Sequence, residues 1–141
     1  MNWQRLSSSS HYQTAVAVQN ELRQGHTDEA AAGIEELIDA LARSEKRALK
    51  SQLVRLMVHV LKWKEQPEQR TRSWSASIGN AREEIADIQE ETPSLNRAAI
   101  KQIWDRCFQA AKRAAEGEMD RKVALRMLTW KDVFETAYEV E

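Results

Sequence analysis

The stretch SEKRALKSQLVRLMVHVLKWKE, residues 44–65, decides the fold of this chain. Its large apolar residues recur at intervals of four and three, a spacing that places them on one face of an α-helix. These residues are Leu49, Leu53, Leu56, Val60 and Trp63. Because Val54, Met57 and Leu61 widen the same face, we expect this helix to be the most buried of the chain. Pro67 ends it, since proline lacks a donor and clashes with the preceding turn.

Segments with similar apolar spacing lie on both sides of the central helix and predict four further helices. They run over residues 11–24, from Thr27 through Leu41, from about Ser73 to Thr92, and from about Ser94 to Gly117. The second of them is expected to bury Ala30, Ile34, Leu37 and Leu41, and the third Trp74, Ile78, Ala81, Ile85 and Ile88. Ser44 is expected to cap the central helix and so to separate it from that segment. Near the C-terminus, Thr129 and Asp132 resemble a shortened capping box and predict a short helix.

The composition excludes a fold rich in β-strands. The 141 residues include only 4 Gly and 2 Pro, and no segment alternates β-branched and polar residues. We therefore expect an all-α fold, an antiparallel bundle of four to five main helices with a short C-terminal helical appendage. The length fits a single helical domain over residues 1–141. Residues 1–10 are expected to be a flexible tail because they end in four consecutive serines.

Cysteine usage and the absence of long apolar runs predict a location. Cys107 is the only cysteine, which excludes an internal disulfide and suits a reducing compartment. The N-terminus, MNWQRLSSSSHY, lacks the apolar run of a signal peptide. No segment reaches the roughly 18 apolar residues of a membrane span. We expect a cytoplasmic protein that does not associate with a membrane.

Candidate catalytic and metal-binding residues are few. His11, His26 and His59 are not paired at helical spacing, and Leu56 stands where a Glu-x-x-His motif at His59 would need Glu. Cys107 lies on an apolar face, where cysteine is more often a buried hydrophobe than a nucleophile. No glycine-rich phosphate loop occurs. We therefore expect no metal, no cofactor and no enzymatic activity.

Charge is distributed unevenly along the chain, although the formal net charge is −1. Residues 44–82 carry a net charge of +6, between segments of −3 and −4. Five acidic residues gather near the end of the helix that Thr92 ends: Glu83, Glu84, Asp87, Glu90 and Glu91. Like charges four residues apart repel, and carboxylates at a helix C-terminus oppose its dipole by roughly 0.3–1 kcal/mol each. This acidic strip either binds a basic partner or pairs with the basic central helix of the same molecule.

The turn after the central helix is a second candidate site. It is expected to bring together His59, Lys62, Arg70, Ser73 and Trp74. In the structural interpretation, Ser73 caps the following helix, Trp74 anchors it and Arg70 pairs with a carboxylate. In the functional interpretation, His59 is an acid or a base, or the start of the following helix binds an anion.

The residues of this turn also resemble a bacterial family called domain of unknown function 29. The resemblance rests on Ser44, Glu45, Leu49, Ser51, Leu53, His59, Leu61, Lys62, Gln66, Pro67, Arg70, Ser73, Trp74, Ile78, Arg82 and the sequence PSL at 93–95. It covers about half of the chain. The resemblance implies an all-helical fold and makes the turn, from His59 to Trp74, a shared feature. It implies no activity.

Three functions from different classes are compatible with these observations. The first is a non-enzymatic protein-binding module, most concretely an immunity or antitoxin protein that occludes a bacterial toxin, for example a nuclease, with its acidic strip. The second is a nucleic-acid-binding protein that uses the basic residues Lys46, Arg47, Lys50, Arg55, Lys62, Lys64, Arg70 and Arg72. The third is an enzyme that uses His59. We expect the first, with a basic protein as partner.

Overall fold

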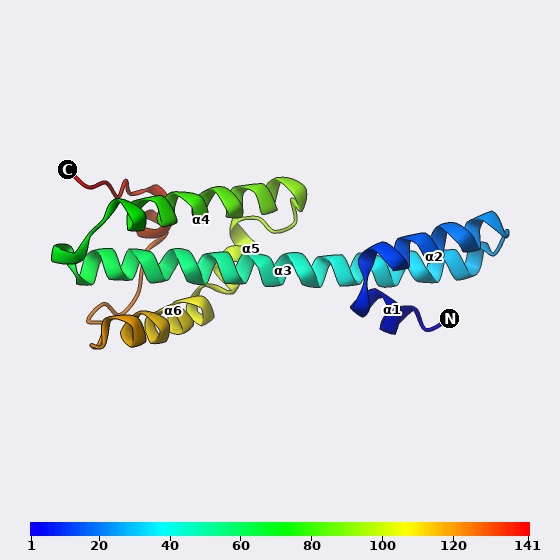
Figure 1. The fold of residues 1–141 in the computed structure, drawn as a ribbon, viewed down its shortest axis with the longest axis horizontal. Helices are drawn as coiled ribbons and strands as arrows, with labels where there is room; N and C mark the ends of the chain where they lie inside the picture. Colours follow the sequence, from blue (N-terminus) through cyan, green and yellow to red (C-terminus); the bar gives the residue numbers. More distant parts are fainter. The chain divides into compact units, whose positions relative to one another are not determined.

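The computed structural model describes residues 1–141, and all of its regular elements are helical (Figure 1). They are α1 (Trp3–Ser9), α2 (His11–Arg23), α3 (Thr27–Glu65), the 3₁₀ turn η1 (Pro67–Gln69), α4 (Arg72–Glu91), α5 (Arg97–Gln102), α6 (Trp104–Met119) and the π-helical turn η2 (Lys131–Glu135). The predicted all-α fold class is confirmed. The single domain expected from the length comprises two compact units, unit 1 (residues 1–47) and unit 2 (residues 48–141). None of the helices is both long enough and apolar enough to cross a membrane.

The longest helix, α3, spans both of the helices that were predicted to be separate at Ser44. The predicted break is wrong, because Ser44 lies inside a continuous helix of 39 residues. No glycine or proline stands between Leu41 and Glu65, and the residues around Ser44 are mostly good helix formers such as Ala, Arg, Glu and Lys. A capping residue interrupts a helix only where the backbone leaves the helical conformation, and nothing in this stretch requires that.

Unit 1 consists of α1, α2 and the first part of α3. The flexible tail predicted for residues 1–10 is wrong, because residues 3–9 form α1 with Trp3 buried. The Trp3 indole packs with Val18 and Ala30, and its Nε1–H donates to the Glu29 carboxylate at 2.9 Å. The side chain of Asn2 caps the helix by accepting the N–H of Arg5. The run of serines suggests a flexible segment, but the burial of Trp3 stabilises the segment as a helix.

Small residues bring the helices of unit 1 together. Ala30, Gly33 and Ala40 are buried on α3. A Cβ atom placed on Gly33 would lie 2.7 Å from Cγ2 of Val18 and 2.8 Å from the ring of Trp3, so the helices meet where Gly33 has no side chain. The predicted apolar face is therefore correct at Ala30 but wrong at Ile34 and Leu41, which remain 41% and 43% exposed.

Unit 2 is built around the C-terminal part of α3, with α4 and α6 alongside it (Figure 1). All five apolar residues predicted for the central helix, from Leu49 to Trp63, are at most 5% exposed. From α4 the core receives Ile78, Ala81 and Ile85, as the spacing predicts. From α5 and α6 it receives Ile100, Cys107, Phe108, Ala111 and Ala115. The face of α3 from Leu49 to Trp63 therefore forms the centre of the core of unit 2.

The C-terminal segment is part of this core. Val123, Leu128, Val133 and Tyr138 are all buried in it. Thr129 and Asp132 form the predicted capping box: the Thr129 N–H donates to the Asp132 carboxylate at 2.9 Å, and the Asp132 N–H donates to the Thr129 hydroxyl at 3.1 Å. The turn that follows is π-helical. The predicted appendage is thus short and helical, and it is packed into the core of unit 2.

Candidate functional site

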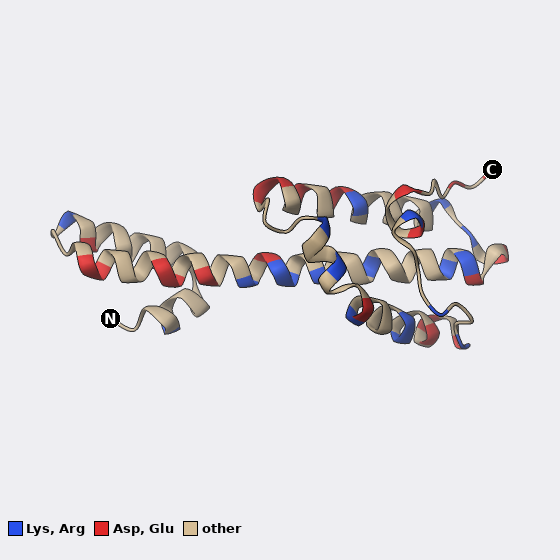
Figure 2. Ribbon diagram, turned by 180° about the vertical axis from the view of Figure 1, so that it is seen from behind, with Lys and Arg blue, Asp and Glu red and all other residues tan.

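Helix α4 has two chemically different sides. One side places Ile78, Ala81 and Ile85 in the core, which fixes the helix to unit 2. The residues of the predicted acidic strip, Glu83, Glu84, Asp87, Glu90 and Glu91, are all exposed. Figure 2 shows acidic side chains gathered toward the end of α4. The structure therefore brings the five predicted carboxylates together on one solvent-facing surface.

The ion pairs within unit 2 are formed by carboxylates outside the acidic strip. They are Lys62 with Glu118, Lys64 with Asp132, and Arg121 with Glu65. These ion pairs include no carboxylate of the strip, and Lys62 and Lys64 of the basic central helix pair with other carboxylates. The last turn of α4 also contains no basic residue that would offset Glu90 and Glu91. The strip is unfavourable for the helix that bears it.

The predicted elbow after α3 is held by stacked cations and aromatic rings. Arg70 Nε donates to the carbonyl oxygen of Trp63 at 2.9 Å, and its guanidinium lies 5.0 Å from the Trp63 ring centroid. The ammonium of Lys62 lies 4.8 Å from the ring centroid of Trp74. The predicted pairing of Arg70 with a carboxylate is wrong, because a carbonyl and a π-face occupy its guanidinium instead.

Three other elbow residues contribute less. Ser73 is exposed and does not cap α4; the side chain of Thr71 does, by accepting the N–H of Trp74 at 3.2 Å. Pro67 starts η1 and is exposed. His59 is half-buried, and its Nδ1–H donates to the carbonyl oxygen of Arg55 one turn earlier, at 2.9 Å. The structure therefore ties His59 to the backbone of its own helix.

Arg82 holds the C-terminal segment against α4. Its Nε donates to the carbonyl oxygen of Val133 at 2.8 Å, and its guanidinium carbon lies 5.5 Å from the ring centroid of Tyr138. Burial lowers the pKa of Arg82, and the neighbouring Tyr138 opposes that shift. The Tyr138 backbone is held in turn, since the Ser75 hydroxyl donates to its carbonyl oxygen at 2.6 Å. These contacts give Arg82 a structural role.

Two titratable groups of unit 2, Cys107 and Asp132, have shifted pKa values with structural causes. Burial raises the pKa of the Cys107 thiol, and Lys50 and Arg106 only partly offset this. Burial also acts to raise the pKa of Asp132, but hydrogen bonds from Thr129 and pairing with Lys64 outweigh it, so the net shift is downward. A raised thiol pKa disfavours the thiolate that a nucleophile needs. No three His, Cys, Asp or Glu side chains are grouped as metal ligands.

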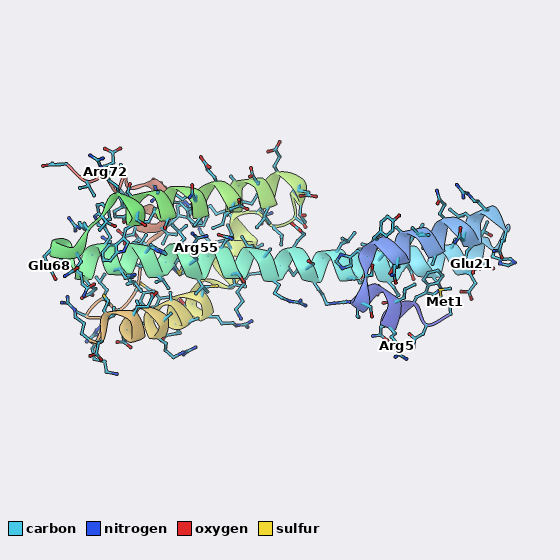
Figure 3. The ribbon with its side chains drawn as sticks, in the orientation of Figure 1. Met1, Arg5, Glu21, Arg55, Glu68 and Arg72 are labelled. Atoms are coloured by element: carbon cyan, nitrogen blue, oxygen red, sulfur yellow. The ribbon has the colours of Figure 1, made fainter.

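Replacing Arg70 tests the elbow as a structural device. We expect Arg70→Lys to lower the free energy of unfolding by about 1 kcal/mol, because lysine lacks the Nε–H and the planar group that stacks on Trp63. Arg72→Lys is the matched control, since Arg72 is exposed at the start of α4 (Figure 3). Urea unfolding followed by tryptophan fluorescence measures both. Identical midpoints for the two variants would show that the Arg70 contacts do not stabilise the turn.

One group of polar residues was missed by sequence reasoning. In unit 1, Ser10, His11, Arg43, Ser44 and Arg47 line a common cavity. The two arginines are four positions apart on α3, next to Ser44, whereas Ser10 and His11 come from a distant part of the sequence. Only the packing of α1 and α2 against α3 in unit 1 brings these parts together. The predicted break at Ser44 hid the one available signal, the spacing of the two arginines on one helix.

The comparisons with known proteins identify a family and no described relative. A family model described as "Domain of unknown function DUF29" matches residues 10–136 of the chain. The resemblance inferred from the central residues is confirmed, and the match reaches from the start of α2 beyond the end of η2. No curated protein and no solved structure matches the chain.

Proposed function

This chain belongs to the family of domains of unknown function DUF29, as the match over residues 10–136 shows, and we propose that it is a non-enzymatic protein-binding module. Its binding surface is the acidic strip of α4. The partner is a basic protein, and the most concrete form of the proposal is an immunity or antitoxin protein. Such a protein would neutralise a bacterial toxin, for example a nuclease, by covering its cationic cleft.

The observation that supports this proposal is the exposure of the five carboxylates and their absence from the ion pairs of unit 2. They are exposed, they lie on one side of one helix, and the ion pairs of unit 2 leave them out. Carboxylates that lack basic neighbours create a negative potential, which accelerates encounter with a cationic surface and disfavours anionic partners. Because the same arrangement opposes the dipole of α4, a role in folding does not account for it.

The packing of α4 adds a second argument. The helix buries three residues in the core, and Arg82 and Ser75 tie it to the C-terminal segment. The carboxylates therefore project from a fixed backbone, which lowers the entropy lost when a partner binds. A rigid, charged surface of this kind suits a protein that docks without changing shape.

Charge reversal of the strip tests the proposal. We expect the triple variant Glu83→Lys, Asp87→Lys and Glu91→Lys to lose binding to the partner recovered with the unaltered chain. The matched control is Glu135→Lys, Glu139→Lys and Glu141→Lys, which changes the net charge equally at exposed positions of the same unit. The measurement is a tagged pull-down from the native host, followed by association kinetics with the purified partner. Undiminished binding by the strip variant would exclude this surface.

Two controls separate the proposal from the other predicted functions. Half of each lysate is treated with nuclease, because binding through nucleic acid by the basic residues of α3 would disappear in that half. The association rate is also measured at two salt concentrations, since steering by the strip weakens as the Debye length falls from about 10 Å at 0.1 M salt to about 3 Å at 1 M salt. Recovery of nucleic acid alone would favour the basic helix, and recovery of neither would favour a small-molecule function at His59.

A further inference from the structure

Unit 1 contains a concave site that the acidic strip does not involve. It lies between the junction of α1 and α2 on one side and the segment of α3 from Ala40 to Arg47 on the other. Its volume is about 290 Å³. That is near the lower end of the range for small-molecule sites, roughly 300–1,000 Å³. Its walls are serine, arginine, histidine and alanine residues, and no carboxylate lines it.

Two arginines supply the charge of this cavity. Arg43 and Arg47 are four positions apart in the sequence, so they occupy successive turns on the same side of α3. Both are exposed, and the ion pairs of the structure are formed by other groups. A guanidinium presents its N–H donors in a planar fork that matches two oxygens of a phosphate or carboxylate. Two such forks on one wall favour an anion that carries more than one charge.

The opposite wall supplies polar groups from the start of α2. Ser10 caps this helix of 13 residues by accepting the N–H of Gln13 at 3.1 Å, and the first helical bond runs from the Thr14 N–H to the Ser10 carbonyl. The ring of His11 lines the same wall. On α3, the half-buried Ser44, which follows Arg43, also lines the cavity with a hydroxyl. The anion would therefore meet donors from two segments that are distant in sequence.

We propose that this cavity binds the phosphate group of a small phosphorylated molecule. A phosphate dianion matches two guanidinium forks better than a single carboxylate does, and the volume leaves space for a small organic group beside it. The site is independent of the proposed function, because all of its residues belong to unit 1 and the acidic strip belongs to unit 2. Loss of either activity would leave the other intact.

A titration of the full chain with defined probes tests the site. The probes are inorganic phosphate and glycerol 2-phosphate, with sodium chloride and sodium acetate at matched ionic strength as controls. Amide chemical shifts of residues 8–12 and 40–47 report binding. We expect saturable shifts with both phosphates, and an affinity lower by about tenfold or more in the double variant Arg43→Gln and Arg47→Gln. Arg5→Gln with Arg23→Gln is the matched control, because it removes the same charge from unit 1 outside this cavity.

The outcomes are distinct. Tighter binding of glycerol 2-phosphate than of inorganic phosphate identifies a phosphorylated small molecule as the ligand, and saturation by the phosphates with no response to acetate supports the anion selectivity. The proposal is overturned if the shifts follow ionic strength alone, or if the Arg43 and Arg47 variant binds phosphate as the control variant does. Circular dichroism of both variants confirms the fold, which we expect to be unchanged because the four arginines are exposed.

Discussion

Gly33→Val is expected to lower the free energy of unfolding of unit 1 by about 3 kcal/mol, the upper part of the usual range for overpacking. Its Cβ would lie 2.7 Å from a methyl group of Val18 and 2.8 Å from the Trp3 ring, distances at which atoms must move apart. Neither neighbour can yield easily, since one is β-branched and the other is a rigid ring. The displacement of Trp3 would also strain its hydrogen bond to Glu29.

The matched control for this substitution is Gly79→Val. Gly79 is also inside a helix, but a Cβ placed there meets no atom within 4 Å. We expect its effect to stay within about 0.5 kcal/mol, because valine and glycine are both modest helix formers. Amide hydrogen exchange measures the two units separately, as local opening reports the stability of each segment. Unchanged protection of α1 and α2 in the Gly33 variant would show that the helices can separate without cost.

Leu128→Ala is expected to have the second large effect, a loss of about 2–5 kcal/mol in unit 2. Leu128 is only 1% exposed and belongs to the core cluster, although it follows all the long helices in the sequence. Its carbonyl oxygen also accepts the indole N–H of Trp104 at 3.0 Å, which fixes the segment to α6. Truncation to alanine would leave a cavity beneath that contact.

Met127→Ala is the matched control for Leu128→Ala. Met127 is the preceding residue and is 59% exposed, so its truncation should change stability by less than about 0.5 kcal/mol. Denaturant unfolding of both variants decides whether the C-terminal segment is a part of the core or a peripheral appendage. Equal midpoints would mean that residues 123–138 can detach while the helices of unit 2 stay folded.

The predictions from sequence were most accurate in unit 2. There the apolar residues are large and recur at regular intervals, so Leu49 to Trp63 and Ile78 to Ile85 are buried as predicted. The capping box of Thr129 and Asp132 was also predicted correctly, because it depends on two residues close in sequence. Local spacing and local hydrogen bonds need no knowledge of the rest of the fold.

The predictions failed where small residues or distant partners decide the structure. In unit 1 the helices approach each other at Gly33. Because glycine has no side chain, the spacing of apolar residues does not reveal this contact. Arg70 was assigned a carboxylate, yet its partner is the carbonyl and ring of Trp63. The cap of α4 was placed two residues late, at Ser73 in place of Thr71. The first two outcomes depend on which groups the folded chain places nearby. The cap is a local bond, and it was misplaced because Thr71 and Ser73 are both suitable capping residues.

The sequence by itself determined the helical class, the buried face of the central helix and the exposed row of carboxylates on α4. These follow from the 3.6-residue period of the helix, which assigns every residue to a side. Only the tertiary structure decided that α1 packs through Trp3 and that Arg43 and Arg47 share a cavity with Ser10 and His11. The reason is that burial and close approach are properties of pairs of segments, and a single sequence does not state which segments meet.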